Sequence, residues 1–135
     1  MILLNFWASH LKTFCIWITG ISGAGKTTLA NEINYILNSN NYSSVSLDGD
    51  SVRKQINQDL GFTIKDRDEN IRRIASISEL LSNQKIITIV SVISPMKHQR
   101  VLAKKIYGEN FNEVYLKASV EKCIESDVKG LYKRA

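Results

Sequence analysis

Three glycines, a lysine and a threonine follow a short apolar stretch near the start of the chain, with the spacing Gly20-x-x-Gly23-x-Gly25-Lys26-Thr27. Glycine lets the backbone adopt positive φ, so that successive N–H groups can turn toward a phosphate chain. The lysine of such a pattern reaches the β- and γ-phosphates of a nucleotide, and the hydroxyl after it is placed to coordinate Mg²⁺. The spacing therefore predicts a loop that binds nucleotide phosphates. The alternative is a glycine-rich turn that binds nothing.

Elements on both sides of this loop fit the same interpretation. Residues 14–19 are apolar and β-branched, which predicts a buried strand that leads into the loop. From Lys26 to about Leu37 the sequence favours a helix, whose N-terminus would add the positive end of its macrodipole.

Two further groups of polar residues follow predicted strands. Asp48 and Asp50 come after a short strand at residues 45–47, with Arg53 just beyond, and Ser94 follows a strand at residues 85–93. A carboxylate at a strand end could act as a base toward a substrate hydroxyl or could support Mg²⁺. The alternative for Asp50 is a helix N-cap, and the alternative for Ser94 is a cap before Pro95.

A third group lies between these two. Phe62 could stack on a base, and Arg67 and Asn70 share one face of a predicted helix at residues 66–82. An arginine can bind a phosphate or a sulfate with two hydrogen bonds. The alternative is a solvated charged helix beside a core phenylalanine.

Strands alternate with helices along the rest of the chain. Pro95 suits the first turn of a helix that continues to about Tyr107, a fourth strand covers residues 114–116, and a short helix covers residues 119–127. This alternation predicts an α/β fold with a parallel sheet and helices on both faces, in which ligands bind beyond the carboxyl ends of the strands. We expect a single domain over residues 1–135.

Composition narrows the functional classes. The chain of 135 residues is 44% hydrophobic and 23% charged, and its net charge of +5 is scattered, without the basic block typical of nucleic-acid binding. Cys15 and Cys123 fit no metal or C-x-x-C spacing, so we expect buried free thiols in a reducing compartment. Residues 1–10 are apolar but lack a basic start and are too short to span a membrane. These features favour a cytoplasmic protein with no nucleic-acid or membrane partner.

Six motifs in order together resemble the adenylylsulfate kinase (APS kinase) family: GISGAGKTT, LDGDSVR, DLGF, DRDENIRR, ISP and KGLYKRA. The resemblance covers about residues 17–135 and implies a P-loop NTPase-type three-layer fold with a mainly parallel sheet. It also implies transfer of the ATP γ-phosphate to the 3′-hydroxyl of adenosine 5′-phosphosulfate, the formation of 3′-phosphoadenylyl sulfate in sulfate assimilation, and a possible homodimer.

The resemblance also assigns roles to residues. Asp50 would be the carboxylate beside the acceptor hydroxyl, Ser94 matches a serine that is phosphorylated in some members, and Lys26, Asp50 and Ser94 are the catalytic candidates. The nucleotide and Mg²⁺ would be held by Gly20, Ile21, Ser22, Gly23, Ala24, Gly25, Lys26, Thr27 and Thr28, with Thr27 as the metal ligand. The acceptor would be bound by Asp50, Arg53, Phe62, Arg67, Asn70, Ile93, Ser94 and Lys129.

The chain departs from the family in three respects. Ser126 replaces an arginine that would lie near the adenine of ATP, and Lys104 replaces a frequent arginine. The family also continues into an F-T-G-I-D segment that closes over the substrate, so we expect a C-terminally truncated domain. Two alternatives remain open: a related kinase with another nucleotide-like acceptor, and an ATP-binding protein without turnover.

Overall fold

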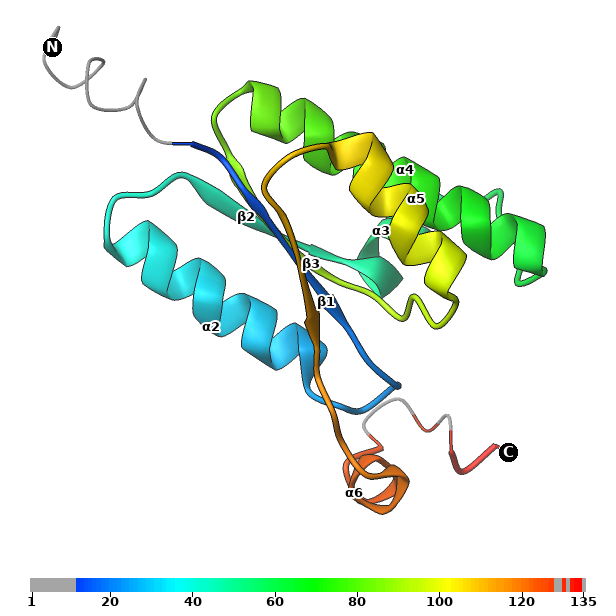
Figure 1. Ribbon diagram of the computed structural model, residues 1–135. Coiled ribbons are helices and arrows are strands. Elements are labelled where there is room, and N and C mark those ends of the chain that lie inside the picture. The colour runs from blue at the N-terminus through cyan, green and yellow to red at the C-terminus, as the bar shows by residue number, and fades with distance from the viewer. Residues whose placement is uncertain (1–11, 128–129, 131, 135) are drawn as a thin grey trace, which may run out of the picture.

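The structure is a computed structural model that describes residues 12–127, 130 and 132–134 (Figure 1). Its strands are β1 (Cys15–Thr19), β2 (Ser44–Asp48), β3 (Ile87–Ser91) and β4 (Phe111–Tyr115). Its helices are α2 (Lys26–Ser39), α3 (Gly49–Gln55), α4 (Ile64–Asn83), α5 (Lys97–Tyr107) and α6 (Val120–Glu125). The predicted alternation of strands and helices is confirmed.

The four strands form one sheet in the order β2-β3-β1-β4, and every neighbouring pair is parallel. Helix α2 covers one face, and α4 and α5 cover the other (Figure 1). The register pairs Asp48 of β2 with Ser91 of β3, and Ser91 with Ile18 of β1, so the carboxyl ends of these strands are level. The three-layer α/β fold is therefore as predicted, and its strand ends present the loops that carry the candidate site.

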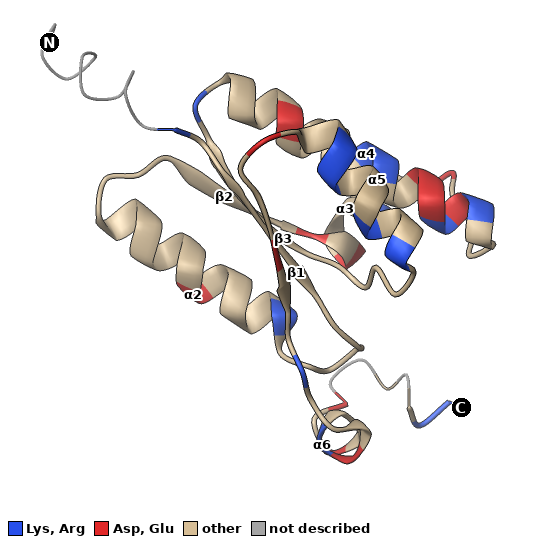
Figure 2. Cartoon of the chain, in the orientation of Figure 1, with Lys and Arg blue, Asp and Glu red and all other residues tan. Residues whose placement is uncertain are grey.

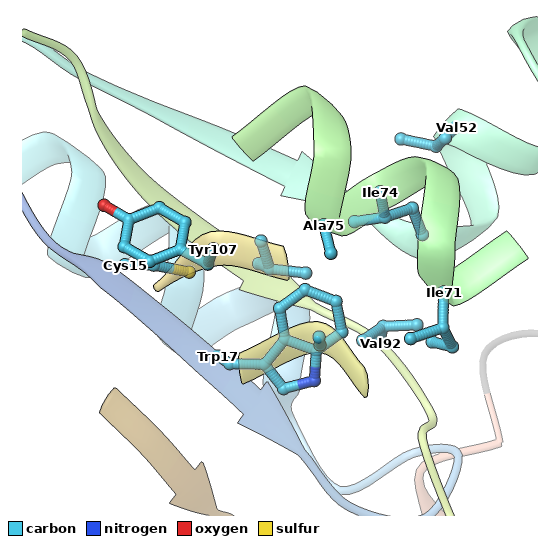
Figure 3. Close-up of a cluster of buried hydrophobic side chains, with 10 residues drawn as sticks. Cys15, Trp17, Val52, Ile71, Ile74, Ala75, Val92 and Tyr107 are labelled. Carbon is cyan, nitrogen blue, oxygen red and sulfur yellow. The ribbon is translucent and has the colours of Figure 1, made fainter. Parts of the chain in front are cut away.

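Alternation along β1 supplies both halves of the core. Trp17 and Ile18 point to opposite faces because successive side chains in a strand do so, and both are fully buried. Trp17 packs toward α4 and α5 with Ile74 and Tyr107, as Figure 3 shows, whereas Ile18 packs toward α2 with Ala30. Two successive residues of β1, a central strand, thus join the two helical layers to the strand that leads into the loop.

Two details of the sequence-based prediction are wrong. Helix α3 begins at Gly49 and is capped by Asp48, whose side chain accepts a hydrogen bond from the Ser51 N–H, so Asp50 is not the cap. Helix α5 begins at Lys97, which places Pro95 before the helix and not in its first turn. In both cases the neighbouring strand ends at a different residue from the one expected.

Two further observations concern membrane-spanning helices and the two cysteines. None of the helices in that part is both long enough and apolar enough to cross a membrane. Cys15 and Cys123 are free and buried, as expected, and burial raises the pKa of the Cys15 thiol to about 12.

Candidate active site

The loop after β1 has the geometry that its glycines predict. Gly23 and Gly25 adopt φ of 80° and 90°, and Gly25 is the N-cap of α2. Lys26 is the first residue of α2, and its Nζ donates a 2.8 Å hydrogen bond to the carbonyl oxygen of Ile21, which holds the ammonium over the loop. A positive helix N-terminus and a lysine therefore meet at one turn, an arrangement suited to binding phosphates.

Gly20 is required for a different reason, the close approach of another strand. A Cβ at Gly20 would lie 2.6 Å from the carbonyl oxygen of Leu116, which directly follows β4. The Leu116 N–H in turn donates to the carbonyl oxygen of Thr19. The start of the loop is therefore packed against the backbone beyond β4, with no room for a side chain.

We expect Gly20→Ala to lower both the melting temperature and the ATP affinity, because the Leu116 backbone would have to move. Gly108→Ala is the matched control: Gly108 also has positive φ, at 93°, but a Cβ there meets nothing within 4 Å. The control should cost about 1–3 kcal/mol of backbone strain without changing ATP affinity. Unchanged ATP affinity in a folded Gly20→Ala variant would contradict the assignment.

Asp48 joins the loop to the second strand. Its Oδ1 accepts from the Thr27 hydroxyl at 2.9 Å and from the Ser91 hydroxyl at 3.2 Å, while its Oδ2 accepts from the N–H and the hydroxyl of Ser51. Burial alone would raise the pKa of Asp48, but these hydrogen bonds outweigh burial and hold the pKa below its ordinary value. An ionised carboxylate thus contacts the threonine that the sequence assigned to the metal.

The sequence analysis placed Asp48 and Asp50 in one cluster and gave the acceptor role to Asp50; it did not indicate that Asp48 caps α3 and contacts Thr27. Asp50 lies in the first turn of α3, two residues after the N-cap Asp48. Asp48 is the last residue of β2, and its capping role follows from the start of α3 at Gly49, a boundary that the sequence pattern does not fix. Figure 2 shows acidic residues where β2 passes into α3.

The Asp48 contacts lead to a pH prediction. Asp48→Ala should destabilise the protein at neutral pH by about 0.5–2 kcal/mol through loss of the cap. Because the pKa is lower in the folded state, this stabilisation is present above the unfolded pKa and is lost as the pH falls through the folded pKa. Unfolding free energies of parent and variant should therefore converge below about pH 4. A difference that stays constant from pH 7 to pH 3 would contradict this role.

Helices α3 and α4 and the connection between them gather three of the predicted acceptor residues. The Arg53 guanidinium lies 4.8 Å from the centre of the Phe62 ring and donates to the carbonyl oxygen of Gly61. The Arg67 Nε donates to the carbonyl oxygen of Phe62 at 3.0 Å. Phe62 is 71% exposed, so the alternative of a core phenylalanine is wrong. The Arg53 guanidinium therefore lies over an exposed aromatic ring, and Arg67 is bonded to the backbone of the same residue.

The loop after β3 is held tightly. Ser94 is fully buried, and its Oγ accepts from the Trp17 indole N–H at 3.1 Å and donates to the Thr19 hydroxyl at 3.0 Å. The carbonyl oxygen of Ser94 accepts from Arg100, which also forms a 2.7 Å ion pair with Glu113. Ser94 is thus hydrogen-bonded to residues of β1 and of α5, which the sequence alone did not indicate.

A cavity of about 330 Å³ opens beside the start of the loop, lined by residues 19–21, residues 93–95, Arg100, Glu113 and Tyr115. Ile93, a predicted acceptor residue, is 43% exposed at its wall. Arg100 was not singled out from the sequence, because its partner Glu113 lies on a distant strand. Lys129, another predicted acceptor residue, lies outside the described residues.

Comparisons with known proteins identify the family of this chain. The adenylylsulphate kinase family model matches residues 12–135. The adenylyl-sulfate kinase of Halothermothrix orenii is 50% identical over 124 residues, 92% of this chain and 66% of the relative. That of Paraburkholderia xenovorans is 47% identical over 120 residues, 89% of this chain and 67% of the relative. The chain spans about two thirds of the length of these curated relatives.

A solved structure supports the same family assignment. The APS kinase CysC of Mycobacterium tuberculosis, in complex with AMPPNP and APS, superposes with a TM-score of 0.89 at 37% identity, covering 92% of this chain and 73% of that one. The chain belongs to the adenylylsulphate kinase family.

Proposed function

We propose that this protein is a kinase that transfers the γ-phosphate of ATP to the 3′-hydroxyl of adenosine 5′-phosphosulfate. The observation that carries the proposal is the family match over residues 12–135, because it runs through both the phosphate-binding loop and the α3–α4 region. A kinase needs both a nucleotide site and an acceptor site, and these two segments supply the chemistry of each.

Residues of the loop would bind ATP through its phosphates. The N–H groups of residues 20–28 and the N-terminus of α2 offer donors and partial positive charge, and Lys26 adds a full charge. Phosphoryl transfer depends mainly on positioning and on charge stabilisation, so this cluster would hold the moving group and neutralise it.

Thr27 and Asp48 fit a magnesium ion that arrives with the nucleotide. Magnesium prefers hard oxygen ligands and usually keeps waters, with one or two carboxylates and the substrate phosphates completing its shell. The hydroxyl of Thr27 and the ionised carboxylate of Asp48 are 2.9 Å apart. Over its described residues the chain has no group of three or more His, Cys, Asp or Glu side chains that could cage a metal alone. When bound, the ion would neutralise phosphate charge.

The acceptor would lie against the α3–α4 region. Arg53, which lies over the Phe62 ring, and Arg67, which donates to the Phe62 carbonyl oxygen, carry positive charge beside an exposed ring that could stack on the adenine. Asp50, in the first turn of α3, would orient the acceptor hydroxyl or remove its proton. Ser94, because it is buried between Trp17 and Thr19, would position the loop after β3.

Arg67→Ala tests the acceptor assignment. The variant should bind adenosine 5′-phosphosulfate about tenfold or more weakly, because it loses a charge-assisted hydrogen bond, and should bind ATP as the parent does. Calorimetry with each ligand separately measures both affinities. Arg72→Ala is the matched control, since Arg72 is on the same helix but pairs with Glu69 through two hydrogen bonds. Equal loss of both ligands would assign Arg67 a structural role instead.

Localisation and assembly are also part of the proposal. Two free, buried cysteines are what a reducing compartment favours, and this supports a cytoplasmic location. Homodimer formation stays a prediction from the family resemblance, to be measured by light scattering.

A further inference from the structure

Asn57 is a buried polar residue that the proposed site does not use. It follows α3, it is fully buried, and its Nδ2 donates a 2.9 Å hydrogen bond to the Oδ1 of Asn70 on α4. Its backbone is anchored too, since its N–H donates to the Val52 carbonyl oxygen and its carbonyl oxygen accepts from Leu60. The side-chain amide of Asn57 is therefore held in place beside Asn70.

Arg73 determines which way the Asn57 amide points. Its guanidinium binds both carboxylate oxygens of Asp59, at 2.7 and 2.8 Å, and donates through Nε to Glu69 at 3.0 Å. Its Nη1 also lies 3.3 Å from the Oδ1 of Asn57. A guanidinium can only donate, so Asn57 must present its oxygen to Arg73 and its NH₂ group to Asn70.

The same donor and acceptor inventory then sets the orientation of Asn70. The Asn57 amide donates an N–H to Asn70, so the acceptor in this bond must be the Asn70 Oδ1. The NH₂ group of Asn70 then remains available as a donor to a ligand. Among the described residues, the hydrogen bond from the Asn57 Nδ2 is the one that the Asn70 side chain makes. The chain of contacts from Asp59 through Arg73 and Asn57 thus ends in an oriented N–H donor.

We propose that Asn57 is a positioning residue that makes Asn70 a hydrogen-bond donor toward the anionic part of the acceptor. Sulfate and phosphate oxygens only accept hydrogen bonds, so an amide that presents its NH₂ group binds them and one that presents its oxygen repels them. Arg67 lies three residues before Asn70 on the same helix and adds a charged donor on that side. This inference rests on the proposed function and deepens it, because it explains how the acceptor's anion is selected.

Asn57→Asp reverses the orientation and tests the proposal. An aspartate still accepts from Arg73 but cannot donate to Asn70, so the Asn70 amide must turn and present its oxygen to the ligand. Titration with adenosine 5′-phosphosulfate in the presence of AMPPNP should show affinity reduced about tenfold or more. AMPPNP affinity should stay within about twofold of the parent value. In an Asn70→Ala background, Asn57→Asp should cause no further loss.

Asn83→Asp is the matched control. It makes the same amide-to-carboxylate change at an exposed residue at the end of α4, whose Nδ2 donates to Glu79 and which has no part in the Asn57–Asn70 contacts, so acceptor affinity should be unchanged. If Asn57→Asp does not fold, Asn57→Ala replaces it: Asn70 would then be free to rotate, and acceptor affinity should fall about threefold. A folded Asn57→Asp variant that binds the acceptor as tightly as the parent, or that loses both ligands equally, overturns the inference. A parent protein that binds AMPPNP and shows no acceptor binding overturns the proposed function itself.

Discussion

A Lys26→Ala variant is expected to lose phosphoryl transfer to adenosine 5′-phosphosulfate by a factor of about 100 or more while keeping its fold. The loss follows from position: Lys26 opens α2, and its ammonium lies over the phosphate-binding loop, 2.8 Å from the Ile21 carbonyl oxygen. Removing one preorganised charge that faces a transferring phosphoryl group typically costs about 100- to 1,000-fold in turnover.

Steady-state kinetics and circular dichroism on the same preparation measure both parts of this prediction. Lys105→Ala is the matched control, since Lys105 is an exposed lysine in the last turn of α5, away from the loop. The control should keep the turnover of the parent. A correctly folded Lys26→Ala variant with parental turnover would show that this loop does not hold the phosphates.

Asp50→Asn is expected to lower turnover by about 100-fold, with ATP affinity unchanged, because general-base assistance contributes about 100- to 10,000-fold. The structure separates this role from a capping role, since Asp48 and not Asp50 caps α3. The stability cost of Asp50→Asn should therefore be at most about 1 kcal/mol, from the lost charge near the helix N-terminus.

Stability and turnover measured on Asp50→Asn and Asp48→Ala together decide between the two roles. The first variant should lose turnover with little loss of stability, and the second should lose stability through its cap. If Asp50→Asn keeps its turnover and Asp48→Ala loses it beyond what its stability explains, the carboxylate that serves the acceptor is Asp48.

The glycine-rich loop before α2 and the parallel sheet could be predicted from the sequence because their signals are local. The spacing of Gly20, Gly25, Lys26 and Thr27 lies within one turn of chain, and the apolar runs before Gly20 and around Val90 are short and continuous. The clustering of Arg53, Phe62 and Arg67 was also within reach, because one connection joins their two helices.

Contacts between distant elements could not be predicted in the same way. The burial of Ser94 depends on Trp17, 77 residues earlier in the chain, and Arg100 finds Glu113 only once β4 is placed at the sheet edge. The role of Asp48 depended on where α3 begins, a boundary that hydrophobic spacing does not determine. The link from Asn57 to Asn70 needs the packing of two helices, which local sequence does not specify.

The most direct test of the proposed function is product identification after incubation of the protein with ATP, Mg²⁺ and adenosine 5′-phosphosulfate. We expect ADP and 3′-phosphoadenylyl sulfate to appear in equal amounts by mass spectrometry, and ADP release to cease when adenosine 5′-phosphosulfate is omitted or replaced by adenosine 5′-monophosphate. ADP release at the same rate without adenosine 5′-phosphosulfate, or saturable ATP binding with no phosphorylated adenylyl sulfate formed, would contradict the proposed function.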